Sequence, residues 1–340
     1  MSASSPYPKV GILGGGQLGK MLVLAAAPLD LPIYILDSSK DVPAASHCYQ
    51  FVAGSFKDYE DVYQFGKDLD IISIEIEHVN TDALRALLAE GKTVHPHPDK
   101  LDIIKDKGLQ KLFYREHGLP TAAFELYEDD KAILEALKNG SLQFPFVQKS
   151  RTAGYDGQGV VLIHSEADLD NLLPVASMVE DLVDLDQEIA VQIARNESRE
   201  IVAFPPVGME FHPTANLVEF LYCPANLEEA TSRKATELAI ATMKAYDLCG
   251  LLSVELFLDK SGELYINEVA PRTHNSGHHT IEAVLTSQFQ QQLRAILNWP
   301  LGPTDIVMPA VMVNLLGAEG YKGPVRYEGL QESLQSSGVY

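Results

Sequence analysis

The first hundred residues alternate short apolar runs with amphipathic stretches. The apolar runs predict strands over residues 9–13, 33–36, 71–76 and 93–95. Between them, apolar positions at helical spacing predict helices over residues 17–27 and 57–68, the second with Ser55 as N-cap, and a third helix that Thr81 caps and Gly91 ends. Repeated strand–helix units of this kind predict a parallel sheet with right-handed crossovers.

The pattern changes beyond a helix predicted over residues 107–117. Two apolar runs, 144–150 and 160–163, share a glycine-rich loop without an intervening helical pattern, which is typical of a β-hairpin. A helix over 166–177, a strand over 187–195, a long helix over 227–247 and two strands over 251–259 and 263–270 follow. We therefore expect an α/β fold whose later parts are α+β, in three domains: 1–115, 116–182 and 183–340.

Composition and charge narrow the class of protein. The 340 residues carry 26 Lys and Arg against 47 Asp and Glu, a formal net charge of −21, without a Lys/Arg-rich stretch. Because nucleic acids and anionic membranes are held by clustered cations, we expect neither as a partner. Three isolated cysteines, an amino terminus unlike a signal peptide and apolar runs too short to cross a bilayer predict a cytoplasmic protein.

The glycine cluster at residues 14–19 reads GGGQLG and lies between the first strand and the first helix. It contains G-x-G-x-x-G, and Asp37 follows about 20 residues on, as in dinucleotide-binding loops. Backbone N–H groups in such a loop can hold a phosphate, or the glycines can serve a tight turn alone. We expect an anion-binding role here, with NAD binding as an alternative.

A second glycine cluster lies in the predicted hairpin, at residues 154–159, and Lys149 precedes it on the first strand. Glycines let a loop lie flat on polyphosphate oxygens, and a strand lysine adds a positive charge there. A plain surface turn needs only one or two glycines, so three favour a phosphate-binding flap.

Two carboxylates in the late strands give the strongest local signal. Glu255 and Glu268 lie within apolar strands, where ionised carboxylates side by side would repel one another, and Asn267 is adjacent. Two carboxylates and an amide are oxygen ligands suited to Mg²⁺. The sequence does not fix the register of the turn, and one acid could instead lie on an exposed face.

The run APRTHNSGHH follows Glu268 directly. Arg272 and His274 in it, with neighbouring hydroxyl and amide donors, suit a small oxyanion beside a metal carboxylate. His274 and His278 have the i, i+4 spacing of a zinc pair, but Pro271 and Gly277 indicate a loop, so we favour the oxyanion.

Taken together, these motifs resemble the ATP-grasp superfamily, and within it the 5-(carboxyamino)imidazole ribonucleotide synthases of purine biosynthesis. The resemblance rests on GGGQLG, RTAGYDGQG and NEVAPRTHNSGH, and it covers nearly all of the chain. It implies an ATP-grasp fold behind an N-terminal Rossmann-like domain, with a small lid domain. It also implies an ATP- and Mg²⁺-dependent ligase, with Mn²⁺ as an alternative metal, which carboxylates 5-aminoimidazole ribonucleotide (AIR) with bicarbonate through carboxyphosphate.

The resemblance assigns roles residue by residue. ATP would contact the following: Lys107, Lys149, Gly154, Tyr155, Asp156, Gly157, Gln158, Gly159, Val160, Glu180, Asp181, Leu182, Val183, Glu188, His212, Asn267 and Glu268. Magnesium would bind Glu255, Asn267 and Glu268. AIR would contact Gln17, Leu18, Glu77, Tyr155, Asp156 and Arg272. Catalysis would fall to Asp156, Arg272 and His274, with Asp156 orienting or deprotonating the amine of AIR.

Two departures from the family pattern and three rival functions remain. Lys107 stands where the family commonly has arginine. A basic segment usual near the carboxy terminus would lie beyond Tyr340, so we expect either that the chain is truncated there or that the sequence omits a disordered tail. On family grounds we expect a homodimer. The rivals are a formate-dependent glycinamide ribonucleotide transformylase, an NAD-dependent oxidoreductase and a non-catalytic nucleotide-binding regulator.

Overall fold

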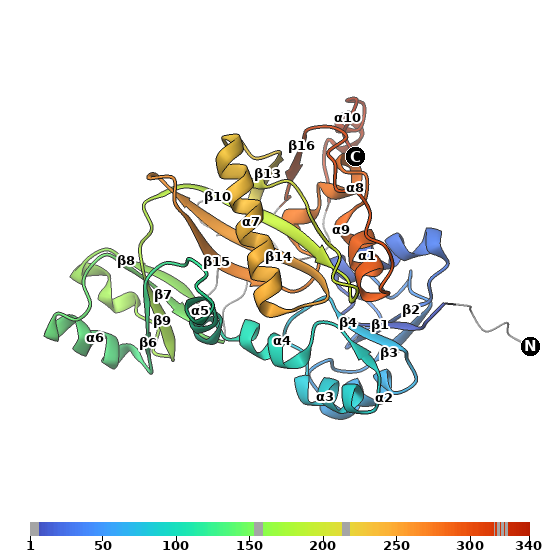
Figure 1. Ribbon diagram of the computed structural model, residues 1–340, viewed down its shortest axis with the longest axis horizontal. Coiled ribbons are helices and arrows are strands. Elements are labelled where there is room, and N and C mark those ends of the chain that lie inside the picture. Colours follow the sequence, from blue (N-terminus) through green and yellow to red (C-terminus); the bar gives the residue numbers. More distant parts are fainter. Residues whose placement is uncertain are drawn as a thin grey trace, which may run out of the picture.

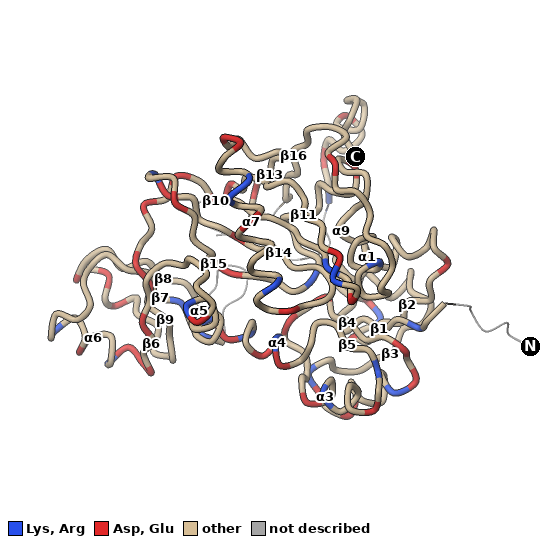
Figure 2. The backbone as a smooth tube through the Cα atoms, viewed as in Figure 1, with Lys and Arg blue, Asp and Glu red and all other residues tan. Residues whose placement is uncertain are grey.

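The computed structural model describes residues 7–152, 159–212, 218–315, 317, 320, 323 and 326–340, and three β-sheets organise that part of the chain. Figure 1 shows the sheets following one another along the chain, from the N-terminal sheet (blue) to the lid-like sheet (green) and the large sheet (yellow to red). The sequence has more acidic than basic residues, and Figure 2 shows both kinds scattered along the backbone. Among the described residues there is no helix long and apolar enough to cross a membrane.

The N-terminal sheet is parallel and has the strand order β3-β2-β1-β4-β5. Its strands are β1 (Val10–Leu13), β2 (Ile33–Asp37), β3 (Gln50–Ala53), β4 (Ile71–Ile74) and β5 (Thr93–Val94). The accompanying helices are α1 (Gln17–Ala26), the 3₁₀ helix η1 (Ala27–Leu29), α2 (Tyr59–Gly66) and α3 (Thr81–Ala89). The predicted parallel sheet is confirmed, since the apolar runs form strands that the structure buries.

Both predicted helix caps in this domain are wrong, one by three residues and the other by one. Asp58 caps α2, because its carboxylate accepts from the N–H of Asp61, whereas the Ser55 hydroxyl accepts from the N–H of Lys57 outside the helix. Asn80 caps α3 by accepting from the N–H of Ala83 at 2.9 Å. Aspartate and asparagine accept from these N–H donors as readily as serine or threonine does, so the residue types at the helix start did not decide which of them is the cap.

The lid-like sheet has the order β6-β9-β7-β8. Helices α4 (Pro98–Lys105) and α5 (Lys107–Glu116) connect it to the N-terminal sheet. Its elements are β6 (Phe124–Tyr127), α6 (Asp130–Asn139), β7 (Phe146–Ser150), β8 (Val160–Ile163), the 3₁₀ helix η2 (Glu166–Asn171) and β9 (Ser177–Asp181). The hairpin of β7 and β8 is confirmed, as is a helix at 107–116.

The helix predicted over 166–177 is wrong. Only the short 3₁₀ helix η2 forms, and Ser177 begins strand β9, which pairs antiparallel with both β6 and β7. Pro174 explains the difference, because proline lacks the N–H that a continuing helix needs.

The large sheet runs β15-β14-β10-β12-β13-β16, with β11 paired to β10. Its strands are β10 (Leu185–Arg195), β11 (Ile201–Ala203), β12 (Val207–Phe211), β13 (Val218–Cys223), β14 (Gly250–Asp259), β15 (Leu264–Ala270) and β16 (Ala310–Val313). The helices here are α7 (Glu229–Tyr246), η3 (Asn275–Gly277), α8 (Thr280–Ala283), α9 (Gln288–Ile296) and α10 (Leu330–Ser333). The long helix and the last strand pair match the sequence prediction.

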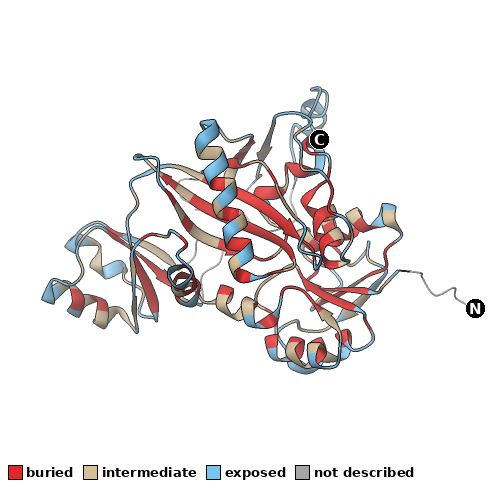
Figure 3. Cartoon of the chain, in the orientation of Figure 1, coloured by how far each residue is buried: buried red, intermediate tan, exposed pale blue. Residues whose placement is uncertain are grey.

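Helices α7 and α9 pack against opposite faces of the large sheet. Ile189, Val191 and Ile193 of β10 lie in one core with Met243 and Tyr246 of α7, which confirms the predicted alternation. Helix α9 covers the opposite face and also packs against β1, β2 and α1, so one helix joins the core of the N-terminal domain to that of the large sheet. Figure 3 shows buried residues concentrated along β10 and β14, where the site described below begins.

Candidate active site

Two facing carboxylates form the centre of the site. Glu255 of β14 and Glu268 of β15 are direct partners across the strand pair, as the sequence suggested they could be. Burial and the neighbouring Glu268 carboxylate raise the pKa of Glu255, whereas the Lys107 ammonium lowers the pKa of Glu268. Glu255 is buried, but the side chain of Glu268 keeps 40% of its surface, so the pair opens toward solvent on one side.

A β-bulge creates this opposition. On the side of the turn, Leu256 of β14 pairs with Ile266 of β15. One residue further from the turn, Glu255 pairs with Glu268 instead of Asn267. Asn267 is therefore the extra residue of β15, and both Asn267 and Glu268 line one small cavity together with Lys107 and Lys149. Without the bulge, the alternation of a strand would place these two side chains on opposite faces.

Three lysines converge on this cavity from α5 and β7. Lys107, the first residue of α5, forms an ion pair with Glu268, and Lys149 of β7 donates to the Asn267 amide oxygen at 2.9 Å. Lys111 lies one turn after Lys107 and is almost fully buried. Positive charge from α5 and β7 thus lines the same cavity as Asn267 and Glu268.

Glu180, which was predicted to contact ATP, forms a buried ion cluster with Lys111, a residue that sequence reasoning missed. The Glu180 carboxylate of β9 pairs with Lys149 and, at 2.9 Å, with Lys111; both carboxylate and Lys111 side chains are 2% exposed. Although burial opposes ionisation, the two ammonium groups hold the pKa of Glu180 at about 2. Burial lowers the pKa of Lys111 to about 8. A lysine in an amphipathic helix gives no signal in the sequence that it points inward.

The other predicted ATP-contacting residues that the structure describes lie on strands β8, β9, β10 and β12 or beside them. Asp181 ends β9, Leu182 and Val183 connect it to β10, and Glu188 of β10 pairs with Phe257 of β14. Burial, chiefly, raises the pKa of Glu188 to about 7. Val160 begins the second hairpin strand β8, Gly159 precedes it, and His212 follows β12. The predicted flap residues Gly154, Tyr155, Asp156, Gly157 and Gln158 lie outside the described residues.

Arg272 and His274 follow the end of β15, and His274 approaches the carboxylate pair at Glu255, whereas Lys107 pairs with Glu268. The Arg272 guanidinium forms an ion pair with Glu77 at 2.7 Å, which joins the large sheet to the loop after β4. The His274 Nε2 atom faces the Glu255 carboxylate at 3.7 Å. Burial and then the Arg272 charge lower the pKa of His274 to about 3, so the ring is neutral near pH 7.

A second residue that sequence reasoning missed, Glu75, follows β4 and contacts the N-terminal glycine loop. Its carboxylate accepts from the N–H groups of Gly16, at 2.6 Å, and Gly19, while Asp37 accepts from Gly15 at 2.7 Å. The chain's own carboxylates therefore occupy donors that a dinucleotide pyrophosphate would need. Gln17 and Leu18 begin α1 at this loop.

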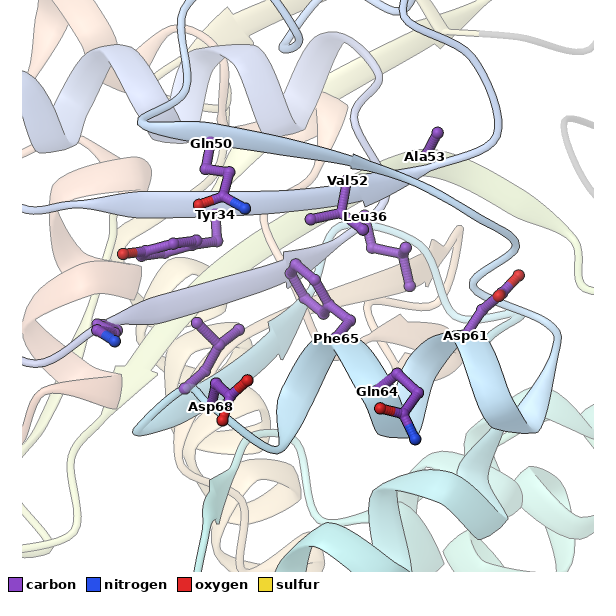
Figure 4. A pocket seen from close by; sticks show the side chains of 11 residues that line it. Tyr34, Leu36, Gln50, Val52, Ala53, Asp61, Gln64, Phe65 and Asp68 are labelled. Atoms are coloured by element: carbon purple, nitrogen blue, oxygen red, sulfur yellow. The ribbon is translucent and has the colours of Figure 1, made fainter.

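A separate hollow of about 340 Å³ lies on the N-terminal domain, between α2 and strands β2 and β3. Figure 4 shows Phe65 and Leu36 forming its apolar floor, with Tyr34, Gln50 and Asp68 around the rim. None of the predicted site residues lines it, so this hollow and the charged cluster are different places.

Comparison with known families agrees with this arrangement. A family model of the ribonucleotide synthetase preATP-grasp domain matches residues 7–105, and a model of the ATP-grasp domain matches residues 112–289. The phosphoribosylaminoimidazole carboxylase of Vigna aconitifolia, a chloroplastic protein, is 37% identical over 317 residues. That match covers 91% of this chain but 56% of the relative, so the chain spans little more than half of its length.

Solved structures give a fuller match. The N5-carboxyaminoimidazole ribonucleotide synthetase of Thermotoga maritima has a TM-score of 0.88 and 40% identity, and the match covers 98% of this chain and 87% of that one. The synthase of Aspergillus clavatus, in complex with ADP and AIR, has a TM-score of 0.84 and 33% identity, with coverage of 92% and 83%. The predicted ATP-grasp fold with its N-terminal parallel sheet is thereby confirmed. The chain belongs to the ATP-grasp family, and within it to the N5-carboxyaminoimidazole ribonucleotide synthases.

Proposed function

We propose that this protein carboxylates the exocyclic amine of AIR with bicarbonate, using ATP, and forms 5-(carboxyamino)imidazole ribonucleotide, ADP and phosphate for purine biosynthesis. One observation carries the proposal: of the facing carboxylates, Glu268 pairs with Lys107, while Glu255 is approached by His274 of the Arg272–His274 segment. A phosphate-binding side and an anion-binding side thus meet at a centre suited to a divalent cation. The complex of the A. clavatus relative with ADP and AIR supports the choice of substrates.

The residues present fit a magnesium ion. Glu255 is buried beside Glu268, and mutual repulsion is among the causes that raise its pKa, so a divalent cation would stabilise both carboxylates in their ionised form. Glu255, Glu268 and the Asn267 amide would hold the ion, which would neutralise the charge of the transferred phosphoryl group. Mn²⁺ can take the same oxygen ligands.

The lysines would bind and orient the nucleotide. Lys107 and Lys149 now pair with Glu268, Asn267 and Glu180, and ATP phosphates would share these donors. Glu188, the Asp181–Val183 connection and His212 would surround the adenosine. The flap at residues 154–160 would close over the phosphates and exclude water, because carboxyphosphate hydrolyses readily in water.

Arg272 and His274 would hold bicarbonate beside the γ-phosphate. A bicarbonate oxygen attacks the γ-phosphorus and ADP leaves, which gives carboxyphosphate; its C–O bond then breaks to release phosphate and CO₂. The AIR amine forms the new N–C bond to that carbon and loses a proton, for which we propose Asp156 as acceptor. Gln17, Leu18, Glu77 and Tyr155 would contact the ribonucleotide.

Phosphate release from MgATP tests this function, measured with AIR and bicarbonate present together and each omitted in turn. We expect release that requires both, and incorporation of labelled bicarbonate into AIR in equal amount. Release with formate and glycinamide ribonucleotide instead would establish the transformylase. Release indifferent to bicarbonate would refute the proposal. The homodimer and the cytoplasmic location stay predictions.

A further inference from the structure

Behind His274 lies a buried hydrogen-bond network that spans three elements of the large sheet and its connections. The Gln192 amide nitrogen of β10 is 3.0 Å from the Ser253 hydroxyl of β14 and 2.6 Å from the Ser276 hydroxyl of η3. The two hydroxyl oxygens are 3.2 Å apart, and that of Ser276 is 2.9 Å from His274 Nδ1. Gln192 is 1% exposed, and both serines are fully buried.

A backbone group decides the direction of these hydrogen bonds. The Ser276 N–H also points at His274 Nδ1, at 3.3 Å, and caps the 3₁₀ helix η3 through the imidazole. A backbone N–H can only donate, so Nδ1 must be an acceptor without a proton. The neutral ring therefore carries its proton on Nε2.

The side chains reinforce the same direction. The Gln192 amide donates to both serine hydroxyls, so each hydroxyl can pass its own proton onward: Ser253 to Ser276, and Ser276 to Nδ1. Every donor in this series of hydrogen bonds then points toward the imidazole. Reversing the glutamine would turn the Ser276 proton away from Nδ1 and leave only the backbone N–H to hold the ring.

The far end of the ring faces the proposed reaction centre. His274 Nε2 is 3.7 Å from the nearest Glu255 oxygen, which is beyond hydrogen-bond length. Within the described ranges, Nε2 has no other hydrogen-bond partner, and the His274 side chain is 18% exposed. Its N–H is thus directed at whatever anion lies beside the carboxylates.

We propose that Gln192, Ser253 and Ser276 are positioning residues that fix His274 as an Nε2–H donor toward bicarbonate and carboxyphosphate. The naming of the anion rests on the proposed function; the tautomer does not. An Nε2 lone pair would repel a bicarbonate oxygen, whereas an Nε2–H donates to it and to the oxygen charge that develops as the C–O bond of carboxyphosphate breaks. These three residues, called the relay below, thus determine which of the two neutral tautomers of His274 faces the anion.

Nitrogen-15 spectroscopy tests the tautomer directly. Protein labelled at the histidine ring nitrogens, with the His274 signals identified by their loss in His274→Gln, should show a protonated Nε2 and an unprotonated Nδ1 near neutral pH without any ligand. A protonated Nδ1 would overturn the proposal. This measurement does not depend on which reaction the protein catalyses.

Two variants test the relay itself. Gln192→Met keeps the side-chain volume and removes the donor, and Ser276→Ala removes the last hydroxyl. In each we expect the two ring-nitrogen signals of His274 to move toward one another, and the KM for bicarbonate to rise about 10-fold, as for loss of one hydrogen bond, with the KM for ATP changed less than about twofold. Gln291→Met is the matched control, because Gln291 is equally buried but, among the described residues, its side chain bonds only to the backbone of Gly302.

The outcomes separate the two proposals. Unchanged ring signals in both relay variants would overturn the positioning role, as would equal changes in the Gln291→Met control. Bicarbonate-independent turnover together with the expected tautomer would refute the proposed function and the choice of anion, while leaving the tautomer established.

Discussion

Replacing Glu180 by glutamine should destabilise this protein strongly, because it leaves two ammonium groups without their counter-charge. The Glu180 carboxylate is 2% exposed and lies 2.9 Å from the Lys111 ammonium, which is equally buried. A pKa of about 2, against an ordinary 4.5, corresponds to about 3 kcal/mol of stabilisation of the ionised form. Breaking a buried pair by removing one partner typically costs about 3–5 kcal/mol, so the two figures agree.

Differential scanning calorimetry measures the effect. At roughly 2–4 °C per kcal/mol, Glu180→Gln should lower Tm by roughly 10 °C. Adding Lys111→Met removes one of the stranded charges and should restore about half of that loss. Asp184→Asn is the control, because its ion pair with Lys260 is exposed and should be worth less than about 1 kcal/mol. A Tm for Glu180→Gln within about 2 °C of the wild type would show that solvent reaches the lysines, and would refute the reasoning.

Three further predictions concern the pH dependence, the site and the fold. Because the folded-state pKa of Glu180 is lowered, the ionised carboxylate stabilises the fold above the unfolded-state pKa, and this stabilisation is lost as pH falls from about 4.5 through about 2. In urea titrations, the free energy of unfolding should therefore fall more steeply with decreasing pH in the wild type than in Glu180→Gln. Parallel curves would contradict this. Glu268→Gln should abolish phosphate release while the circular dichroism spectrum is unchanged, and normal release would remove Glu268 from the proposed metal ligands. Asn80→Ala should cost about 1 kcal/mol of unfolding free energy in urea, because it removes the acceptor that caps α3, whereas Ser55→Ala should cost less; equal losses would restore Ser55 as a cap.

Periodicity predicted the elements whose pattern is set by burial on one face. The alternation of Ile189, Val191 and Ile193 predicted a strand, and the structure packs all three against α7. It failed at residues 166–177, where apolar spacing was compatible with a helix but Pro174 and the pairing of β9 with β6 and β7 decided for a strand. Strand pairing is a long-range interaction, and no local pattern records it.

The charged residues of the site divide in a similar way. Glu255 and Glu268 were recognised because a carboxylate within an apolar strand is conspicuous. Lys111 was missed because its neighbours in α5 give an ordinary amphipathic pattern, and its burial depends on β9 and β15 lying beneath the helix. Glu75 was missed because its partners are backbone N–H groups of a loop 59 and 56 residues away, and hydrogen bonds to the backbone leave no mark on the partner's side chain.

The bulge in β15 shows why even a correct choice of residues does not give the site. Counting outward from the turn in a regular hairpin, Glu255 would oppose Asn267, and Glu268 would point to the other face. One extra residue shifts the register by a single step and brings Glu255 and Glu268 face to face, while Asn267 and Glu268 line the same cavity as Lys107 and Lys149. The apolar residues on both sides of the bulge stay in register with β14, so the hydrophobic core tolerates the shift. The chemistry of this site therefore depends on a local irregularity, which hydrophobic patterning does not specify and the fold supplies.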